Sequence, residues 1–220
     1  MTMRLALNAL VAAAAISFSI TAAEAATQIG KVVAVVGAPS ASGPGGDRKL
    51  SAGSAVFEDD KISVGGSGNA QLILNDDTRL VVGPGSTLLL DRFLMKGGNS
   101  AQKVSIKTLR GTFRFITGRS AKSAYQISTS SATIGIRGTG FDFWDKTKSG
   151  VAVMRGSVRL CSGGFCAALD EQCEVGRAGG GTANELTGAD AGNAIYTNFP
   201  FILDQSRLRS QFHLPIGRCR

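Results

Sequence analysis

The sequence predicts an all-β fold, and three observations support this expectation. The segment 58–160 consists of short runs of β-type residues separated by turn residues. Glycine is abundant, with 29 residues, whereas stretches with helical periodicity are few. One phrase recurs in near-copies: LRGTFRF at 109–115, IRGTGFDF at 136–143 and MRGSVRL at 154–160. We therefore expect a single compact domain of about a dozen short strands, arranged as a β-sandwich, a roll or a short β-helix.

Apolar and polar residues alternate in most of these runs, as in strands with one buried face. The first run, 29–37, is almost continuously apolar, which indicates a strand that is buried on both faces or leads into the core. The segment 38–49 is rich in Gly, Pro and Ser and predicts a mobile, exposed loop. The other expected strands are 61–64, 70–74, 79–82, 87–95, 103–108, 112–115, 124–128, 133–136, 141–144, 150–154, 157–161 and 166–169.

The two ends of the chain depart from this pattern. Arg4, the apolar run 5–20 and the small-x-small sequence Ala23-Glu24-Ala25 predict a secretory signal peptide that is cleaved after Ala25. No later stretch is long and apolar enough to cross a membrane, so we expect a soluble, exported mature protein. The expected organisation is a signal peptide at 1–25, an all-β domain at 26–175, a glycine-rich linker at 176–192 and a tail at 193–220 that packs on the core.

Apolar residues in the tail follow helical spacing. Phe201, Leu208 and Phe212, together with Gln205, lie three or four residues apart, and Pro200 suits the first turn of a helix. We expect a short amphipathic helix on the β core. The alternative is an extended tail that is held by its apolar side chains.

Four cysteines, an even number in an exported chain, predict two disulfides. Cys161 and Cys166 flank Ser-Gly-Gly-Phe, which has the composition of a hairpin turn and would bring them opposite each other. Of the three possible connectivities we prefer Cys161–Cys166 with Cys173–Cys219, the second bond joining the tail to the core. The spacing and the oxidising compartment argue against the rival interpretation, a zinc site.

The formal net charge of +8 is unevenly distributed. The segment 92–122 contains eight basic residues and no acidic one. We therefore consider a basic binding face for an anionic envelope polymer, such as lipopolysaccharide, peptidoglycan or acidic polysaccharide. Its candidate residues are Lys103, Lys107, Arg110, Arg114 and Arg119. The alternative is a solvated surface whose basic side chains discourage strand-to-strand association. Export argues against nucleic acid as a partner.

The Arg-Gly-Thr/Ser phrases have two interpretations. In the structural one, Gly111, Gly138 and Gly156 adopt positive φ or allow close backbone approach, and the next residue enters a strand. In the functional one, the preceding arginines form a ring of guanidinium groups for an anionic ligand.

The order of these phrases resembles the FecR domain, which is named after the ferric-citrate regulator of bacterial envelopes. The resemblance covers about 58–160 and is carried by DKISVGGSGNAQLILNDDTRLVVGPGSTLLLDRF at 60–93, KTLRGTFRFITG at 107–118, ATIGIRGTGFDF at 132–143 and MRGSV at 154–158. Arg137, Gly138 and Thr139 match the most recognisable family motif. The resemblance implies an all-β periplasmic protein similar to the stand-alone exported FecR-domain proteins of Gram-negative bacteria.

The chain also departs from the regulator itself. The regulator joins a sigma-factor-binding region in the cytoplasm and a membrane helix to its periplasmic part, whereas this chain has a predicted signal peptide in their place. We therefore expect only the properties of the exported domain to transfer.

No catalytic motif is evident in the sequence. His213 is the only histidine, and the acidic clusters at 58–60 and 76–77 lie at expected turns, where Asp is favoured for backbone reasons. We expect no enzyme activity and no cofactor. The leading hypothesis is a non-catalytic binding or scaffold module for an envelope protein. The alternatives are an accessory of a surface-receptor signalling system and a binder of anionic envelope polysaccharide or lipopolysaccharide.

Overall fold

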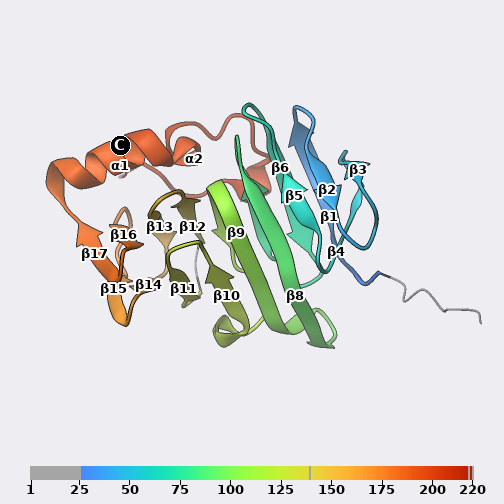
Figure 1. The fold of residues 1–220 in the computed structure, drawn as a ribbon, viewed down its shortest axis with the longest axis horizontal. Coiled ribbons are helices and arrows are strands. Elements are labelled where there is room, and N and C mark those ends of the chain that lie inside the picture. The colour runs from blue at the N-terminus through green and yellow to red at the C-terminus, as the bar shows by residue number, and fades with distance from the viewer. Residues whose placement is uncertain (1–25, 139, 218, 220) are drawn as a thin grey trace, which may run out of the picture.

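The computed structural model describes residues 26–138, 140–217 and 219, and strands make up most of this part (Figure 1). The predicted signal peptide at 1–25, with its cleavage after Ala25, and Thr139 of the family motif lie outside the described residues. The described part contains no helix of the length and apolar character needed to cross a membrane.

The all-β prediction is confirmed, with 17 strands in the described part. Their bounds are β1 Gln28–Val36, β2 Ser40–Ser42, β3 Arg48–Lys49, β4 Ala55–Phe57, β5 Lys61–Ser63, β6 Asn69–Leu74, β7 Arg79–Val82, β8 Thr87–Gly97, β9 Ser100–Ile116, β10 Tyr125–Ser128, β11 Thr133–Ile136, β12 Gly140–Asp145, β13 Ser149–Arg155, β14 Val158–Ser162, β15 Phe165–Leu169, β16 Val175–Gly179 and β17 Thr182–Leu186. The helical elements are η1 Lys122–Ala124, α1 Gly188–Asn198, α2 Pro200–Leu203 and η2 Ser210–Phe212.

The strands form two layers that share β9. Layer A has the order β4-β1-β6-β7-β9-β12-β13-β16-β17. Layer B has the order β3-β2-β5-β8-β9-β10-β11-β14-β15. All these pairs are antiparallel except β9 with β10. The first part of β9 pairs in layer B and its last part, from Gly111 onward, pairs with β12 in layer A, so this strand joins the two layers.

The main core lies between the layers and is rich in aromatic side chains. Phe113 and Phe143 stack with their ring centroids 5.0 Å apart, and Phe141 contacts both Phe115 and Phe143. These residues alternate along β9 and β12, so one face of each strand points into the core. Phe141 and Phe143 are therefore core residues, and they do not form a surface platform for a sugar.

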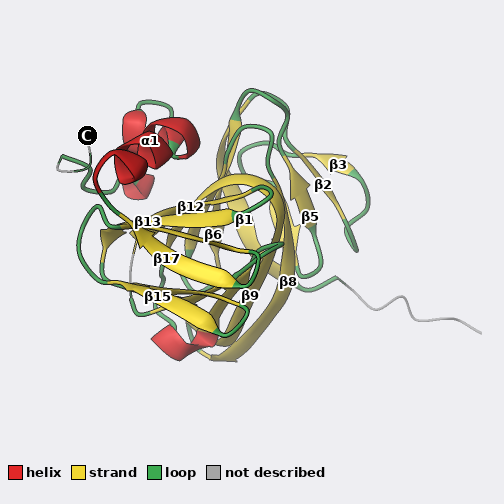
Figure 2. Cartoon of the chain, turned by 60° about the vertical axis from the view of Figure 1, so that its left-hand side comes forward, coloured by secondary structure: helices red, strands yellow, loops and turns green. Residues whose placement is uncertain are grey.

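The outer face of layer A is covered by the C-terminal segment (Figure 2). Met154 and Trp144 pack there in a second apolar cluster with Ala194 of α1, Phe199 and Ile202. Phe201, Leu208 and Phe212 pack with Val81 in a third. β12 and most of β13 are consequently buried on both faces.

Two expectations for the C-terminal part were wrong. The segment 176–192 is not a linker, because it contains most of β16, all of β17 and the start of α1. Gly176 in this segment is required by close packing, because a Cβ at this position would lie 2.8 Å from the Leu169 side chain. The continuous helix that we expected around 200–212 is instead two single turns, α2 and η2, separated by non-helical residues. The longer helix is α1, where Ala191, Ala194 and Ile195 follow helical spacing.

The preferred disulfide pairing is confirmed. Cys161 and Cys166 face each other across the β14–β15 hairpin, and Cys173 is bonded to Cys219 in the tail. Disulfides of this kind are typical of proteins that fold in an oxidising compartment.

The loop expected at 38–49 contains the short strands β2 and β3, which are paired with each other.

Candidate functional site

The glycines of the repeated phrase behave as the structural interpretation predicts. The φ angles of Gly111, Gly138 and Gly156 are 115°, 74° and 83°, in the region that favours glycine. Gly111 lies where β9 passes from layer B to layer A, and a Cβ at this position would be 2.1 Å from the Ser86 hydroxyl oxygen. The phrase therefore marks three places where the backbone conformation favours glycine, and at Gly111 a Cβ would also clash with Ser86.

The arginines of the phrase do not form a ring. Arg110 precedes Gly111, which pairs with Asp145 at one end of the β9–β12 ladder, whereas Arg155 pairs with Gly140 at the other end. The five residue steps between Asp145 and Gly140 correspond to about 17 Å along a strand. Arg137 lines a separate hollow of about 220 Å³ on layer B together with Arg159. The phrase thus places its guanidinium groups in different parts of the surface.

The residues of the predicted basic face are also separated. Lys103 and Lys107 are exposed on β9 in layer B, and Lys107 forms an ion pair with Asp91. Burial raises the pKa of Asp91, but hydrogen bonds from Lys107 and Ser105 and the charges of both lysines outweigh it and hold the pKa below its usual value. Arg119 pairs instead with Asp77 in the β6–β7 hairpin.

Arg114 is buried, so the expectation that it continues the basic surface was wrong. It does point away from Phe113 and Phe115, as the alternation predicts, but the tail covers that side. Its Nε and Nη2 donate to the two carboxylate oxygens of Asp142, at 2.6 and 2.9 Å. Two carbonyls of the tail accept from the same guanidinium: Phe212 O is 3.1 Å from Nη1 and Phe201 O is 3.0 Å from Nη2.

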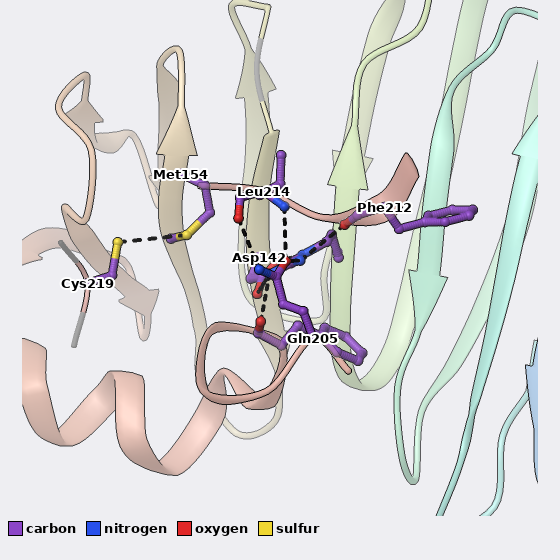
Figure 3. A network of polar contacts seen from close by, with 8 residues as sticks. Asp142, Met154, Gln205, Phe212, Leu214 and Cys219 are labelled. Atoms are coloured by element: carbon purple, nitrogen blue, oxygen red, sulfur yellow. Dashed lines mark hydrogen bonds and ion pairs between the residues drawn. The ribbon is translucent and has the colours of Figure 1, made fainter. Parts of the chain in front are cut away.

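Gln205 also belongs to this arrangement (Figure 3). We use the name tail latch for Arg114 and Asp142 on layer A together with Gln205 of the tail. The side-chain oxygen of Gln205, Oε1, accepts hydrogen bonds from the Arg114 guanidinium and from Leu214 N, the second at 2.9 Å. Its Nε2 donates to Leu214 O at 3.0 Å. Burial raises the pKa of Asp142 more than the guanidinium of Arg114 lowers it. The tail latch uses its charged groups for packing the tail, and they are not available to a ligand.

A cleft of about 430 Å³ lies where the helical segment meets the turn of β9 between the layers. We call it the corner cleft. The layer side contributes Pro84, Gly85, Arg110, Gly111, Thr112, Asp145 and Lys146, and the helical side contributes Tyr196, Thr197, Pro200 and Leu203. Tyr196 is 78% exposed, the largest fraction among the exposed large hydrophobic residues of the described part.

The charged groups of the corner cleft differ in whether they already have hydrogen-bond or ion-pair partners within the fold. The carboxylate of Asp145 is buried and accepts from Thr108 Oγ1 at 2.7 Å and Ser130 N at 3.0 Å. Lys146 is exposed and donates from Nζ to Asn198 Oδ1 at 2.8 Å. Arg110 is exposed and has no ion-pair partner within the described ranges. The accessible charge of the cleft is therefore positive.

The acidic clusters at the turns have structural roles. Asp60 is buried and paired with Arg48. Asp76 is buried and accepts from Ser120 Oγ at 2.6 Å and Tyr125 OH at 3.0 Å. In the described part, no group of three or more His, Cys, Asp or Glu residues is placed to hold a metal ion.

Comparison with known proteins identifies the family. Residues 60–159 match the model of the family described as FecR protein. This segment of the chain belongs to the FecR family, as the order of its phrases predicted.

Two solved structures are similar to part of the chain. Both are crystal structures of a "putative anti-sigma factor" from Parabacteroides distasonis, and each is 15% identical in sequence to this chain. The matches have TM-scores of 0.48 and 0.49 and cover 62% of this chain and 63% of each other chain. This chain thus spans less than two thirds of the length of those proteins. No curated protein matches it.

Of the residues in the corner cleft, only Arg110 was predicted from the sequence as a binding candidate. Lys146, Tyr196 and Thr112 were missed because they come from three separate segments. Tyr196 lies in the stretch next to the supposed linker, where nothing in the local pattern distinguishes it from other surface residues. Tyr196 can be recognised as a candidate because it is an exposed aromatic residue on α1, and this requires the position of that helix to be known.

Proposed function

We propose that this protein is a non-catalytic binding module of the bacterial periplasm, acting in envelope signalling by holding another envelope protein. The FecR segment and the two disulfides support an exported regulatory protein. The corner cleft is the observation that carries the proposal. A concave, mostly apolar surface with a few polar groups at its border is the usual form of a recognition site.

The arrangement of titratable groups supports binding rather than catalysis. The buried carboxylates of Asp60, Asp76 and Asp142 are each held by hydrogen bonds or an ion pair within the fold. His213 contacts the Leu208 carbonyl at 3.0 Å from Nε2 and lies on the tail, away from the residues that line the corner cleft. The charged side chains at the corner cleft are therefore suited to orienting a ligand.

The test is cross-linking of the tagged mature protein in intact cells, followed by identification of the captured material by mass spectrometry. We expect repeated recovery of one defined envelope protein. A tagged exported protein of unrelated fold serves as the control for nonspecific capture. Recovery of only wall or lipopolysaccharide material, or of the same proteins as the control, would contradict the proposal.

Lys103 and Lys107 favour a second candidate function, the binding of an anionic envelope polymer. Both are exposed on one face of β9, although Asp91 neutralises part of their charge. On this hypothesis the variant Lys103→Glu/Lys107→Glu loses salt-sensitive retention on purified envelope fractions. Arg114 is left unchanged because it is buried in the tail latch. Unchanged retention of the variant would rule this function out.

A further inference from the structure

A second hollow lies beside the corner cleft, between the tail and layer A. The second hollow has a volume of about 250 Å³ and shares Pro84 and Pro200 with the corner cleft. The tail contributes to its lining through Phe201, Asp204, Arg207 and Leu208, so this hollow contains charges of both signs. The two hollows are therefore neighbours on the surface, with Pro84 and Pro200 between them.

The lining of the corner cleft is mainly apolar. Pro84 and Pro200 lie on its two sides, Leu203 adds an aliphatic side chain, and the ring of Tyr196 is largely exposed beside them. Covering an exposed aromatic ring contributes favourably to binding, because aromatic side chains carry a large apolar area and a polar end. An apolar side chain of a ligand therefore fits this part of the corner cleft.

The free charges at the cleft are cationic. Arg110 presents a guanidinium without an ion-pair partner in the described part of the chain, and this group suits the two oxygens of a carboxylate. The Lys146 ammonium uses one of its three donors on Asn198. Asp145 is the one carboxylate in the lining, and its buried oxygens are directed to Thr108 and Ser130. A ligand with a carboxylate next to an apolar group thus matches the cleft.

The chemistry of the lining distinguishes a peptide from a sugar polymer. A saccharide presents many hydroxyl groups and needs several side-chain partners for them. Here the uncharged polar side chains are Thr112, Tyr196 and Thr197, and the Thr112 hydroxyl oxygen is buried. An acidic peptide with an apolar side chain needs fewer uncharged polar partners, because it binds mainly through an apolar contact and a pairing of its carboxylate with a cation.

We propose that the corner cleft binds an acidic peptide segment of the partner protein, with an apolar side chain against Tyr196 and Leu203 and a neighbouring Asp or Glu at Arg110 and Lys146. The proposal rests on the function proposed above and names the part of the partner that is recognised. Charges at the border of such a site contribute mainly to specificity and orientation.

The test uses three matched series of immobilised ten-residue peptides and the purified mature protein. The first series carries Leu or Phe flanked by Asp or Glu, the second has Lys in place of the acids, and the third keeps the acids but replaces the apolar residue with Gly or Ser. We expect the first series to bind at least about tenfold more tightly than either of the others, which corresponds to about 1.4 kcal/mol.

Three variants locate the binding. Arg110→Glu/Lys146→Glu reverses the cleft charges and should lose at least about tenfold in affinity for the first series. Tyr196→Ala should weaken binding of the first series while leaving the weak binding of the third unchanged. Lys103→Glu/Lys107→Glu makes the same change in net charge on layer B and should bind like the wild type. The thermal unfolding midpoint of each variant verifies that it is folded.

Several results would overturn the proposal. The first is equal binding of the acidic and the basic peptides, and the second is no binding of the first series at all. The third is an equal loss of affinity in the cleft variant and the layer B variant. The fourth is displacement of the first series by an acidic polysaccharide such as polygalacturonate but not by free acidic peptide. The cellular experiment separates the two proposals. If a partner is captured equally by wild type and Arg110→Glu/Lys146→Glu, the binding-module function stands and the cleft assignment fails. If no partner is captured, the function itself fails.

Discussion

Gly111 shows how one residue sets the path of the chain between the layers. Its φ of 115° is rarely adopted by other residues, and Ser86 occupies the space where a Cβ would lie. The Ser86 hydroxyl accepts from Thr112 N at 2.8 Å and donates to Thr112 O at 3.1 Å, which holds the next residue of β9. The turn of β9 and the floor of the corner cleft therefore depend on the same contact.

We expect Gly111→Ala to lower the free energy of unfolding by more than about 2 kcal/mol, because it adds both backbone strain and a clash. Gly135→Ala is the control: it lies in β11, and its Cβ would be 3.7 Å from the carbonyl oxygen of Arg159, an ordinary van der Waals distance. Urea denaturation measures both. Similar effects of the two substitutions would show that Gly111 has no special conformational role.

Asp91 makes a pH-dependent contribution to stability. Its pKa in the folded protein is below its ordinary value of 3.8, so the folded state favours the charged form. The contribution is present above about pH 4 and is lost as the pH falls through the lower, folded pKa. We expect Asp91→Asn to be less stable than wild type at pH 7 and equal to it at the lowest pH at which both fold. Thermal unfolding midpoints across this range measure the difference, and a difference independent of pH would exclude an ionic contribution.

The C-terminal tail is attached by a disulfide and by hydrogen bonds from Arg114, whose buried ion pair with Asp142 lies in layer A, in addition to its apolar side chains. Arg114 and Asp142 are fully buried, so removal of one partner leaves the other charge without compensation. This asymmetry distinguishes the tail latch from the exposed pairs of the surface, which contribute little.

We expect Asp142→Asn or Arg114→Met to cost about 3–5 kcal/mol in the free energy of unfolding. The double variant Arg114→Met/Asp142→Leu should cost less than the sum of the single changes, because no buried charge remains. A double-mutant cycle by urea denaturation measures this coupling. Additive effects would mean that the two charges do not stabilise each other.

The two disulfides differ in the length of chain that they close. The sequence separation is 46 residues for Cys173–Cys219 and 5 for Cys161–Cys166. In the chain-entropy model these loops correspond to about 4 and about 2 kcal/mol. We expect Cys173→Ser/Cys219→Ser to be the less stable of the two double variants in thermal unfolding. The opposite order would show that the hairpin bond, and not the tail bond, is the principal covalent support of the fold.

At the scale of the whole molecule, the C-terminal segment makes a third layer on the two layers of strands (Figure 2). It covers the outer face of layer A and leaves layer B as the surface that carries Lys103 and Lys107. The corner cleft forms at the border of this third layer. The tail is therefore part of the proposed binding site as well as of the fold.

The predicted export of the whole protein has its own test. The protein recovered from the periplasm should begin at Ala26, since the small residues before it match the cleavage rule. N-terminal sequencing and intact mass measure this, and Ala25→Phe should accumulate the uncleaved form. Recovery of wild-type protein with residues 1–25 still attached would contradict the predicted processing.

Most strands could be predicted from the sequence because each depends on a local pattern. Alternation predicted β6, β7 and β11, and turn residues predicted the β14–β15 hairpin and with it the pairing of Cys161 and Cys166. The FecR phrases predicted the family. Short strands such as β3, with two residues, carry too little pattern to be recognised, and β16 and β17 lie in a segment whose glycine and alanine content resembles that of a linker.

The sequence alone predicted the all-β class, the positions of most strands, the preferred disulfide pairing and the family. Which surfaces are free depends on the tertiary structure. Arg114 and Asp142 are both charged and alternate with core residues, so their local pattern is that of an exposed strand face, but the tail folds back and buries them. Arg110, Lys146 and Tyr196 meet at one cleft only because β9 turns at Gly111 and α1 lies beside that turn. Local pattern encodes which face of a strand is apolar, whereas burial and charge juxtaposition depend on contacts between residues far apart in the chain.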